Sequence, residues 1–214
     1  SGILRYPVFV KPRWGTGSIG IEIARTEEEL ELAYSLLKFR LSRTILSDIS
    51  QSDPERSVLI QEMISGEEYG LDIINNLKGE YVTTFTKRKL SMRAGETDKA
   101  RTVHNTHLME LGEKLGRLFR HVGVMDCDVL SDGQGRMAVL ELNPRFGGGY
   151  PFSHMAGANI PAAILAWLEG KEPEPEWLQI TEGVASAKYD MLTIIANEPI
   201  AVREGHKPLV KKRS

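Results

Sequence analysis

One segment, Val124 to Asn143, most constrains what this chain can fold into. Apolar side chains alternate there with acidic or polar ones on either side of a Gly- and Asp-containing stretch, Ser131 to Gly135. Alternation with a period of two predicts two antiparallel strands joined by a turn, with one face buried. We therefore expect a β-hairpin whose core face carries Cys127, Val129, Ala138, Leu140 and Leu142.

The other face of this hairpin gathers four polar side chains. With the turn centred at positions 134/135, Asp128 lies opposite Glu141, and Asp126 lies opposite Asn143. Carboxylates opposed across a strand pair are destabilising by up to ~1 kcal/mol, so they need a cation or water between them. Because Mg²⁺ prefers carboxylate and other oxygen ligands, we expect a Mg²⁺ site here. A solvated acidic face is the alternative.

Arg145 follows Asn143 by two residues and lies on the same side if the chain stays extended. An arginine beside a bound metal can hold a transferring phosphoryl group through two parallel hydrogen bonds. The hairpin is therefore interpreted as a magnesium–nucleotide site.

A glycine-rich loop follows the apolar strand predicted at 8–11. Residues 15–20 match the dinucleotide-binding pattern G-x-G-x-x-G, but that pattern requires a helix to begin at its last glycine. Here Ile19 to Ile23 reads as a strand and the helix cap comes only at Thr26, so a dinucleotide-binding fold is excluded. The loop can still enclose phosphates with its free amides, helped by Lys11. A flexible hairpin turn is the alternative.

A second candidate for nucleotide contact is the strand predicted at 58–62, together with the two residues that follow it. Adenine needs apolar walls and a backbone edge, which Gln61 to Ile64 can offer, and Glu68 can reach ribose hydroxyls. Many strands end in acidic loops, so this pattern alone is weak.

The remaining elements predict an α+β fold of antiparallel hairpins covered by helices. We expect further strands at 69–74 and 81–86, a basic irregular loop over 87–103, and a last strand pair within 184–195. We expect helices from Thr26 to about 46, from 106 to 121, and two short ones before Gly170, the second beginning at Pro161.

Composition narrows the class of protein. A net charge of −2 over 214 residues argues against nucleic-acid binding. No apolar run reaches the ~18 residues that cross a bilayer, and the first residues lack a signal peptide pattern. The single cysteine excludes an internal disulfide. We expect a cytoplasmic protein, and, because the chain opens at a serine just before a strand, one that lacks an N-terminal part.

Together these features resemble the ATP-grasp superfamily, in its branch of carbamoyl-phosphate-synthase-like and carboxylate–amine ligases. The resemblance covers about residues 8–170, and its most specific element is Asp128 followed by Glu141-x-Asn143-Pro144-Arg145-Phe146-Gly147-Gly148-Gly149. It implies a nucleotide held between two lobes of antiparallel sheet with helices. The implied divisions are a smaller lobe at 1–64, a larger lobe with the Mg–ATP site at 65–170, and a linker and C-terminal strands at 171–214.

The resemblance also implies the roles of individual residues. The Mg²⁺ ligands are Asp128, Glu141 and Asn143, with Mn²⁺ as a possible substitute. The catalytic residues at the reactive end are Arg145, Lys87 and Arg93. The residues that contact ATP are Lys11, Gly15, Thr16, Gly17, Ser18, Ile19, Gln61, Glu62, Met63, Ile64, Glu68 and Leu140.

The activity implied is ATP-dependent formation of an acyl-phosphate from a carboxylate, or from bicarbonate or carbamate, followed by attack of an amine. The family's N-terminal domain and an upstream phosphate-contacting lysine are absent here, so a non-catalytic ATP-binding module or one half of a split enzyme is the alternative. Expected partners are small-molecule carboxylates and amines, neither nucleic acid nor membrane, with a homodimer or a separate subunit as further possibilities. The basic residues at 87–93 hint at an anionic substrate, although the triphosphate alone explains them.

Overall fold

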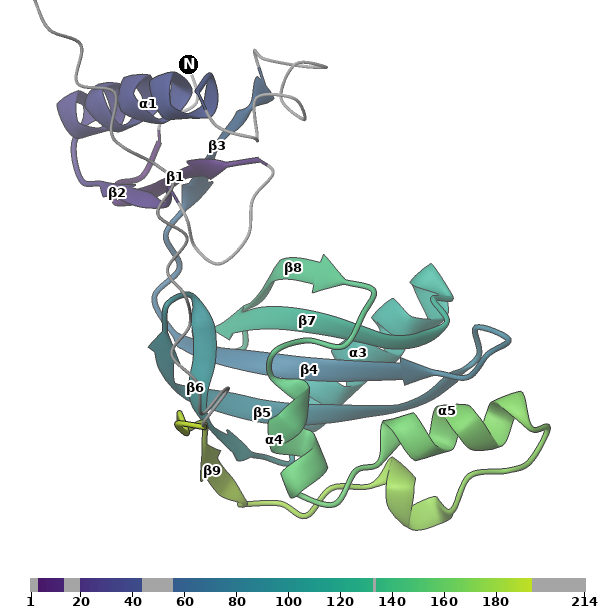
Figure 1. The fold of residues 1–214 in the computed structure, drawn as a ribbon. Helices are drawn as coiled ribbons and strands as arrows, with labels where there is room; N and C mark the ends of the chain where they lie inside the picture. The colour runs from purple at the N-terminus through teal and green to yellow at the C-terminus, as the bar shows by residue number, and fades with distance from the viewer. Residues whose placement is uncertain (1–3, 14–19, 44–55, 133, 194–214) are drawn as a thin grey trace, which may run out of the picture.

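Two antiparallel sheets with helices packed on them make up the fold (Figure 1). The computed structural model describes residues 4–13, 20–43, 56–132 and 134–193. This confirms the α+β class expected from the sequence. Within those residues, no helix combines the length and apolar character needed to cross a membrane. The predicted domain boundaries stay a prediction.

The smaller sheet has the order β2-β1-β3. Its strands are β1 (Val8–Pro12), β2 (Glu22–Ala24) and β3 (Val58–Glu62). Helix α1 (Glu27–Leu41) covers one face and buries its Leu37 and Leu41 against Val8, Val10 and Ala24.

The N-terminal cap of α1 is half of the predicted capping box. Thr26 Oγ1 accepts from the backbone N of Glu29 at 3.2 Å, as expected. The Glu29 carboxylate accepts from the backbone N of Arg25 instead of that of Thr26. The helix ends at Leu41, earlier than predicted, and positions 44–46 lie outside the described residues.

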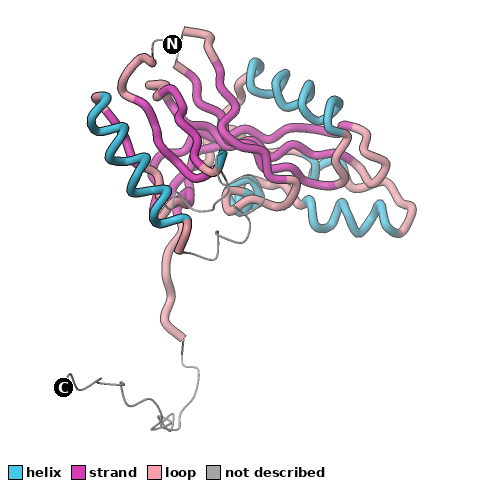
Figure 2. The backbone as a smooth tube through the Cα atoms, turned by 90° about the horizontal axis from the view of Figure 1, so that it is seen from above, coloured by secondary structure: helices cyan, strands magenta, loops and turns pink. Residues whose placement is uncertain are grey.

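The larger sheet has the order β8-β7-β4-β5-β6-β9. Its strands are β4 (Glu67–Asn75), β5 (Tyr81–Arg93), β6 (Glu96–Thr102), β7 (Gly123–Ser131), β8 (Met137–Asn143) and β9 (Ala185–Ala187). Its helices are α3 (Thr106–Phe119), α4 (Tyr150–Met155), α5 (Ile160–Leu168) and the 3₁₀ turn η2 (Pro175–Leu178). Seen from above, helices flank this sheet on both faces (Figure 2).

Each face of the larger sheet has its own apolar core. On one face Leu71, Ile73 and Cys127 pack with Leu108 of α3. On the other face, Ile74 and Phe85 pack with residues of α4 and α5. The alternation of side chains along β4 therefore sends every second residue toward α4, and Gly70 and Asp72 lie on that side.

The prediction of an irregular loop over 87–103 was wrong. β5 continues to Arg93 and pairs with β6 around a two-residue turn at Ala94 and Gly95, both of which have positive φ. The period-two pattern was hidden because three consecutive basic residues, 87–89, put charge on both faces of the strand, where they pair with acids of β4. Arg88 lies 2.6 Å from Glu67 in this way.

The predicted last strand pair was also wrong. Only Ala185–Ala187 forms a strand, and it pairs with β6 at the edge of the larger sheet. Residues 188–193 are not in a strand, and positions 194–195 lie outside the described residues.

The acidic hairpin has the predicted register where it matters for the site. Asp128 pairs with Glu141 and Asp126 pairs with Asn143. A bulge follows Asp128, so that Val129 pairs with Val139. Cys127 and Val129 are fully buried as expected.

Candidate functional site

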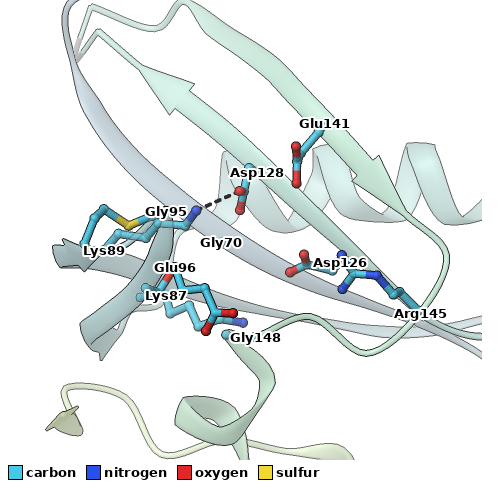
Figure 3. A pocket seen from close by; sticks show the side chains of 13 residues that line it. Gly70, Lys87, Lys89, Gly95, Glu96, Asp126, Asp128, Glu141, Arg145 and Gly148 are labelled. Atoms are coloured by element: carbon cyan, nitrogen blue, oxygen red, sulfur yellow. Dashed lines mark ion pairs between the residues drawn. The ribbon is translucent and has the colours of Figure 1, made fainter. Parts of the chain in front are cut away.

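A pocket of about 150 Å³ opens on the α4 side of the larger sheet (Figure 3). Strands β4, β5, β6, β7 and β8 contribute to it, together with Gly95 of the β5–β6 turn and the loop that leads into α4. The charged residues that line it are Lys87, Lys89, Glu96, Asp126, Asp128, Glu141 and Arg145.

Gly70 creates space in the floor of this pocket. It pairs with Lys87 on one side and with Asp128 on the other. A Cβ at this position would lie 3.2 Å from Lys87 Cε, which is a tight approach. A larger residue at 70 would therefore displace the Lys87 stem and fill the floor.

Lys89 joins two of the predicted site residues. Its Nζ lies 2.6 Å from Glu68 Oε1 and 2.7 Å from Asp128 Oδ2. Burial opposes the charged form, but the Asp128 and Glu68 carboxylates outweigh it, and the pKa of Lys89 is raised. Burial raises the pKa of the Asp128 carboxyl, while Lys89 acts in the opposite direction. The ammonium of Lys89 thus neutralises a predicted metal ligand and the predicted ribose ligand together.

Lys87 lies beneath the pocket, and its ammonium is already paired. Only 2% of its side chain is exposed, and its Nζ lies 2.6 Å from Oδ2 of Asp72, which is fully buried. Ser153 of α4 donates to the same Asp72 oxygen. Lys87 contributes its aliphatic stem to the pocket wall, packed so closely under Gly149 that a Cβ there would meet Lys87 Cε at 2.8 Å. Its predicted catalytic role stays a prediction.

Asp126 points into the pocket between the hairpin and the loop that follows it (Figure 3). It pairs with Asp72 on β4 and with Asn143 on β8. Burial raises the pKa of the Asp126 carboxyl to about 6, the neighbouring Asp128 carboxylate adds to the rise, and Lys87 acts against it. The carboxylate is therefore held in an environment poor in compensating positive charge.

The donor set around Glu141 fits the expected Mg²⁺ site. Asn143 Nδ2 donates to Glu141 Oε1 at 2.7 Å, which leaves the amide oxygen of Asn143 available. Two carboxylates and an amide oxygen, completed by phosphate oxygens and water, suit Mg²⁺. Among the described residues, no three His, Cys, Asp or Glu side chains gather in a way that could hold a metal by themselves. A metal at Asp128 and Glu141 would therefore depend on Asn143 and on ligand oxygens, and would compete with Lys89.

Arg145 lines the same pocket, as the sequence predicted. It is exposed, and its Nη1 donates to the backbone O of Phe146 at 3.0 Å, which leaves other guanidinium donors facing the pocket (Figure 3). Such a planar group suits a phosphoryl or acyl-phosphate oxygen.

Other predicted site residues lie elsewhere. Arg93 is held outside the pocket by Asp98 and Asp190, at 3.0 and 2.5 Å. Glu62 pairs with Arg136 of the hairpin at 3.0 Å. Several more do not line this pocket: Lys11, Gln61, Met63, Ile64 and Leu140. The predicted flap residues Gly15, Thr16, Gly17, Ser18 and Ile19 lie outside the described residues.

The sequence did not predict Asp72 or Ser153 at the site, and it predicted Lys89 only as one of the basic residues at 87–93. Lys89 was detectable, because Lys87 and Lys89 are spaced by two and so share a strand face. Asp72 sits in an apolar strand, where a lone carboxylate implies a buried cationic partner. Ser153 has no local signal, since only the packing of α4 brings it to Asp72.

Curated relatives match over this region. The chain is 26% identical over 157 residues to the carbamoyl phosphate synthase large chain of Clavibacter michiganensis subsp. michiganensis, covering 66% of this chain and 13% of that protein. It is 24% identical over 212 residues to the arginine-specific carbamoyl phosphate synthase large chain of Bacillus subtilis, and the match covers 94% of this chain and 19% of that protein. It is 28% identical over 152 residues to the D-alanine–D-alanine ligase of Streptococcus equi subsp. zooepidemicus, covering 66% and 40%. The chain thus spans less than half the length of each.

Solved structures share the fold. The biotin carboxylase of Campylobacter jejuni aligns with a TM-score of 0.66 at 18% identity, over 82% of this chain and 40% of that one. The L-amino acid ligase of Bacillus licheniformis aligns with a TM-score of 0.61 at 17% identity, over 89% of this chain and 48% of that one. The family model described as "ATP-grasp in the biosynthetic pathway with Ter operon" matches residues 54–191, which is more than half of the chain. The chain therefore belongs to this ATP-grasp family.

Proposed function

We propose that this protein is an ATP- and Mg²⁺-dependent ligase that activates a carboxylate as an acyl-phosphate and joins it to an amine. The observation that carries the proposal is the pairing of Asp128 with Glu141 at a pocket that also contains Arg145. Opposed carboxylates call for a cation, and an arginine beside them suits phosphoryl oxygens.

Asp128, Glu141 and Asn143 are the residues that would hold Mg²⁺, and Mn²⁺ is expected to substitute. When bound, the metal neutralises charge on the phosphates and orients them for transfer. Lys89 is the residue that must respond to it, because its ammonium pairs with Asp128 when no metal is present. Released from Asp128, the ammonium lies at the same pocket and can pair with a phosphate oxygen.

The reaction proceeds in two balanced steps. A carboxylate oxygen attacks the γ-phosphorus of ATP, the bond to the β-phosphate oxygen breaks, and ADP leaves. The amine nitrogen, in its uncharged form, then attacks the carbonyl carbon of the acyl-phosphate, a C–N bond forms, phosphate leaves with the electrons of the C–O bond, and the nitrogen gives up one proton to the departing phosphate or to water. Arg145 stabilises the charge on the phosphoryl oxygens in both steps.

The relatives support this reaction class. A D-alanine–D-alanine ligase and an L-amino acid ligase point to a carboxylate and an amine as substrates. The biotin carboxylase domain of the Hydrogenobacter thermophilus 2-oxoglutarate carboxylase, which shares the fold, was solved with MgADP and bicarbonate, so bicarbonate or carbamate is the alternative group to be activated. A homodimer or a separate subunit as partner stays a prediction.

Hydroxylamine trapping tests the proposal. The protein is incubated with MgATP, hydroxylamine and each member of a panel of amino acids and short carboxylic acids, and ADP and hydroxamate are measured. We expect one or more carboxylates to give both products in equal amounts, or bicarbonate to stimulate ADP release. Arg145→Ala should remove turnover and keep most of the affinity for ATP. ATP binding with neither ADP nor hydroxamate from any carboxylate would show a non-catalytic ATP-binding module instead.

A further inference from the structure

The basic segment at 87–93 does not offer free positive charge to a substrate. Each of its four basic side chains is paired with a carboxylate. The pairs are Lys87 with Asp72, Arg88 with Glu67, Lys89 with Glu68 and Asp128, and Arg93 with Asp98 and Asp190. Without a bound metal, this segment therefore has no unpaired positive charge, and the expectation of an anionic substrate stays a prediction.

Asp126 is a charged residue of the pocket that has no partner of opposite charge among the described residues. Within the described part of the chain, its carboxylate makes no ion pair and no hydrogen bond, although it lines the same pocket as Lys87, Lys89 and Arg145. The two lysines are held by other carboxylates, and Arg145 bonds to a backbone oxygen. Glu96, also at the pocket, is paired with Lys188 at 2.9 Å.

The loop after the hairpin is shaped to keep this carboxylate in place. A Cβ at Gly147 would lie 2.2 Å from Asp126 Cγ and Oδ1, so any side chain there would occupy the position of the carboxylate. Gly147 is buried and Asp126 is half-buried. A carboxylate kept in contact with a glycine backbone, beside Asp72 and Asp128, lies where a positively charged group is attracted.

We propose that Asp126 binds the ammonium group of the amine nucleophile and so selects a cationic second substrate. This inference rests on the proposed function. The position fits the role, because Asp126 lies two residues along β7 from the proposed Mg²⁺ ligand Asp128 and on the same face, in the pocket that also contains Arg145. Binding is the contribution of Asp126, and the bound ammonium group gives up a proton to water before its nitrogen attacks in the covalent step given above.

The test compares two nucleophiles in the protein and in Asp126→Asn. Hydroxylamine is uncharged at mildly alkaline pH, whereas ammonia, methylamine and amino acids are present mainly as ammonium ions. With the carboxylate found in the hydroxamate screen, kcat/KM is measured for the best amine and for hydroxylamine. The ratio of the two reports recognition of charge and cancels any general loss of activity. Glu113→Gln, which removes an exposed carboxylate from α3, is the matched control.

We expect Asp126→Asn to lower the amine-to-hydroxylamine ratio about tenfold or more, through a higher KM for the amine, because a charge-assisted hydrogen bond is lost. Glu113→Gln should keep the ratio of the unchanged protein. An unaltered ratio in Asp126→Asn would overturn the inference and leave the proposed function standing. If Asp126→Asn altered the Mg²⁺ dependence of the reaction and left the ratio unaltered, Asp126 would belong to the metal site, and the inference would also be overturned. If the unchanged protein gave neither hydroxamate from any carboxylate nor ADP release stimulated by bicarbonate, the proposed function and this inference would both be wrong.

If Asp126→Asn does not fold, a competition measurement on the unchanged protein tests whether the pocket binds an ammonium group. Methylammonium chloride and neutral acetamide, which are similar in size, are added to the hydroxylamine reaction. We expect methylammonium to compete with hydroxylamine at concentrations about tenfold below those at which acetamide does. Equal inhibition by the two would contradict binding of an ammonium group in the pocket.

Discussion

The ammonium of Lys89 lies 2.7 Å from the carboxylate of Asp128, at the position where a cation neutralises the acidic hairpin. Asp128 faces Glu141 across β7 and β8, and Glu68 pairs with the other side of the ammonium. The lysine and the expected Mg²⁺ therefore compete for one carboxylate. This competition means that loading of the site depends on both metal and phosphates, since the displaced lysine needs a new anionic partner.

Lys89→Met should raise the affinity for Mg²⁺ alone by about tenfold or more, because a positive charge a few ångströms from the metal is removed. Isothermal titration with MgCl₂ in the absence of nucleotide measures this. Arg88→Met is the matched control, because Arg88 pairs with Glu67 on the exposed side of the same strand. Equal or weaker Mg²⁺ binding by Lys89→Met would contradict the competition.

Lys87→Met should destabilise the protein by about 3–5 kcal/mol, because it leaves the buried Asp72 carboxylate without its cation. The double variant Asp72→Asn with Lys87→Met should recover part of that loss. Urea unfolding of the single and double variants measures the coupling. Lys78→Met, at an exposed turn, should change stability little. Additive losses in the double variant would show that the pair is not coupled.

Gly147→Ala should lower the free energy of unfolding by about 1–3 kcal/mol, because its methyl group would overlap the Asp126 carboxylate. Gly148→Ala is the neighbouring control, since its Cβ would have ordinary contacts, the nearest at 3.5 Å. Chemical denaturation compares the two. Equal stability of both variants would argue against close packing of this loop on Asp126.

His121 makes stability fall in mild acid. Its Nε2 lies 3.0 Å from the backbone O of Ile73, and burial lowers its pKa below 6.5. Because the folded-state pKa is below the unfolded one, the unfolded chain gains the proton first, and stability is lost as pH falls below about 6.5. The free energy of unfolding of His121→Gln should fall less between about pH 7.5 and 5.5 than that of the unchanged protein. The exposed His107→Gln should behave like the unchanged protein, and an identical slope in His121→Gln would refute the role.

The acidic hairpin could be predicted because its information is local. Alternation determines the faces, and the turn centre assumed at positions 134/135 pairs Asp128 with Glu141. The bulge after Asp128, which shifts the pairs nearer the turn by one residue, could not be predicted from the sequence. A proline and three glycines follow the hairpin, so its end could be predicted as well. Arg145 could therefore be placed beside the acidic face from its spacing to Asn143. Both pairs of polar residues have the predicted register.

The strand from Lys87 to Arg93 could not be predicted in the same way. Its side chains are stabilised by carboxylates distant in sequence, such as Glu67 and Asp190, so nothing local distinguishes it from a solvated loop. The burial of Lys87 has the same origin, because it depends on Asp72 and Ser153. Patterns in the sequence determine where strands turn, whereas long-range ion pairs determine which charges remain free.

The central claim, a Mg–nucleotide site built on the acidic hairpin, is tested most directly by Mg²⁺-dependent binding of ATP to Glu141→Gln. Isothermal titration with ATP, in MgCl₂ and in EDTA, is carried out on this variant, on the unchanged protein and on Glu113→Gln. We predict tight binding that requires Mg²⁺ in the unchanged protein and in Glu113→Gln, and binding at least about tenfold weaker, with little dependence on Mg²⁺, in Glu141→Gln. Binding of ATP by Glu141→Gln with unchanged affinity and unchanged Mg²⁺ dependence would contradict the account.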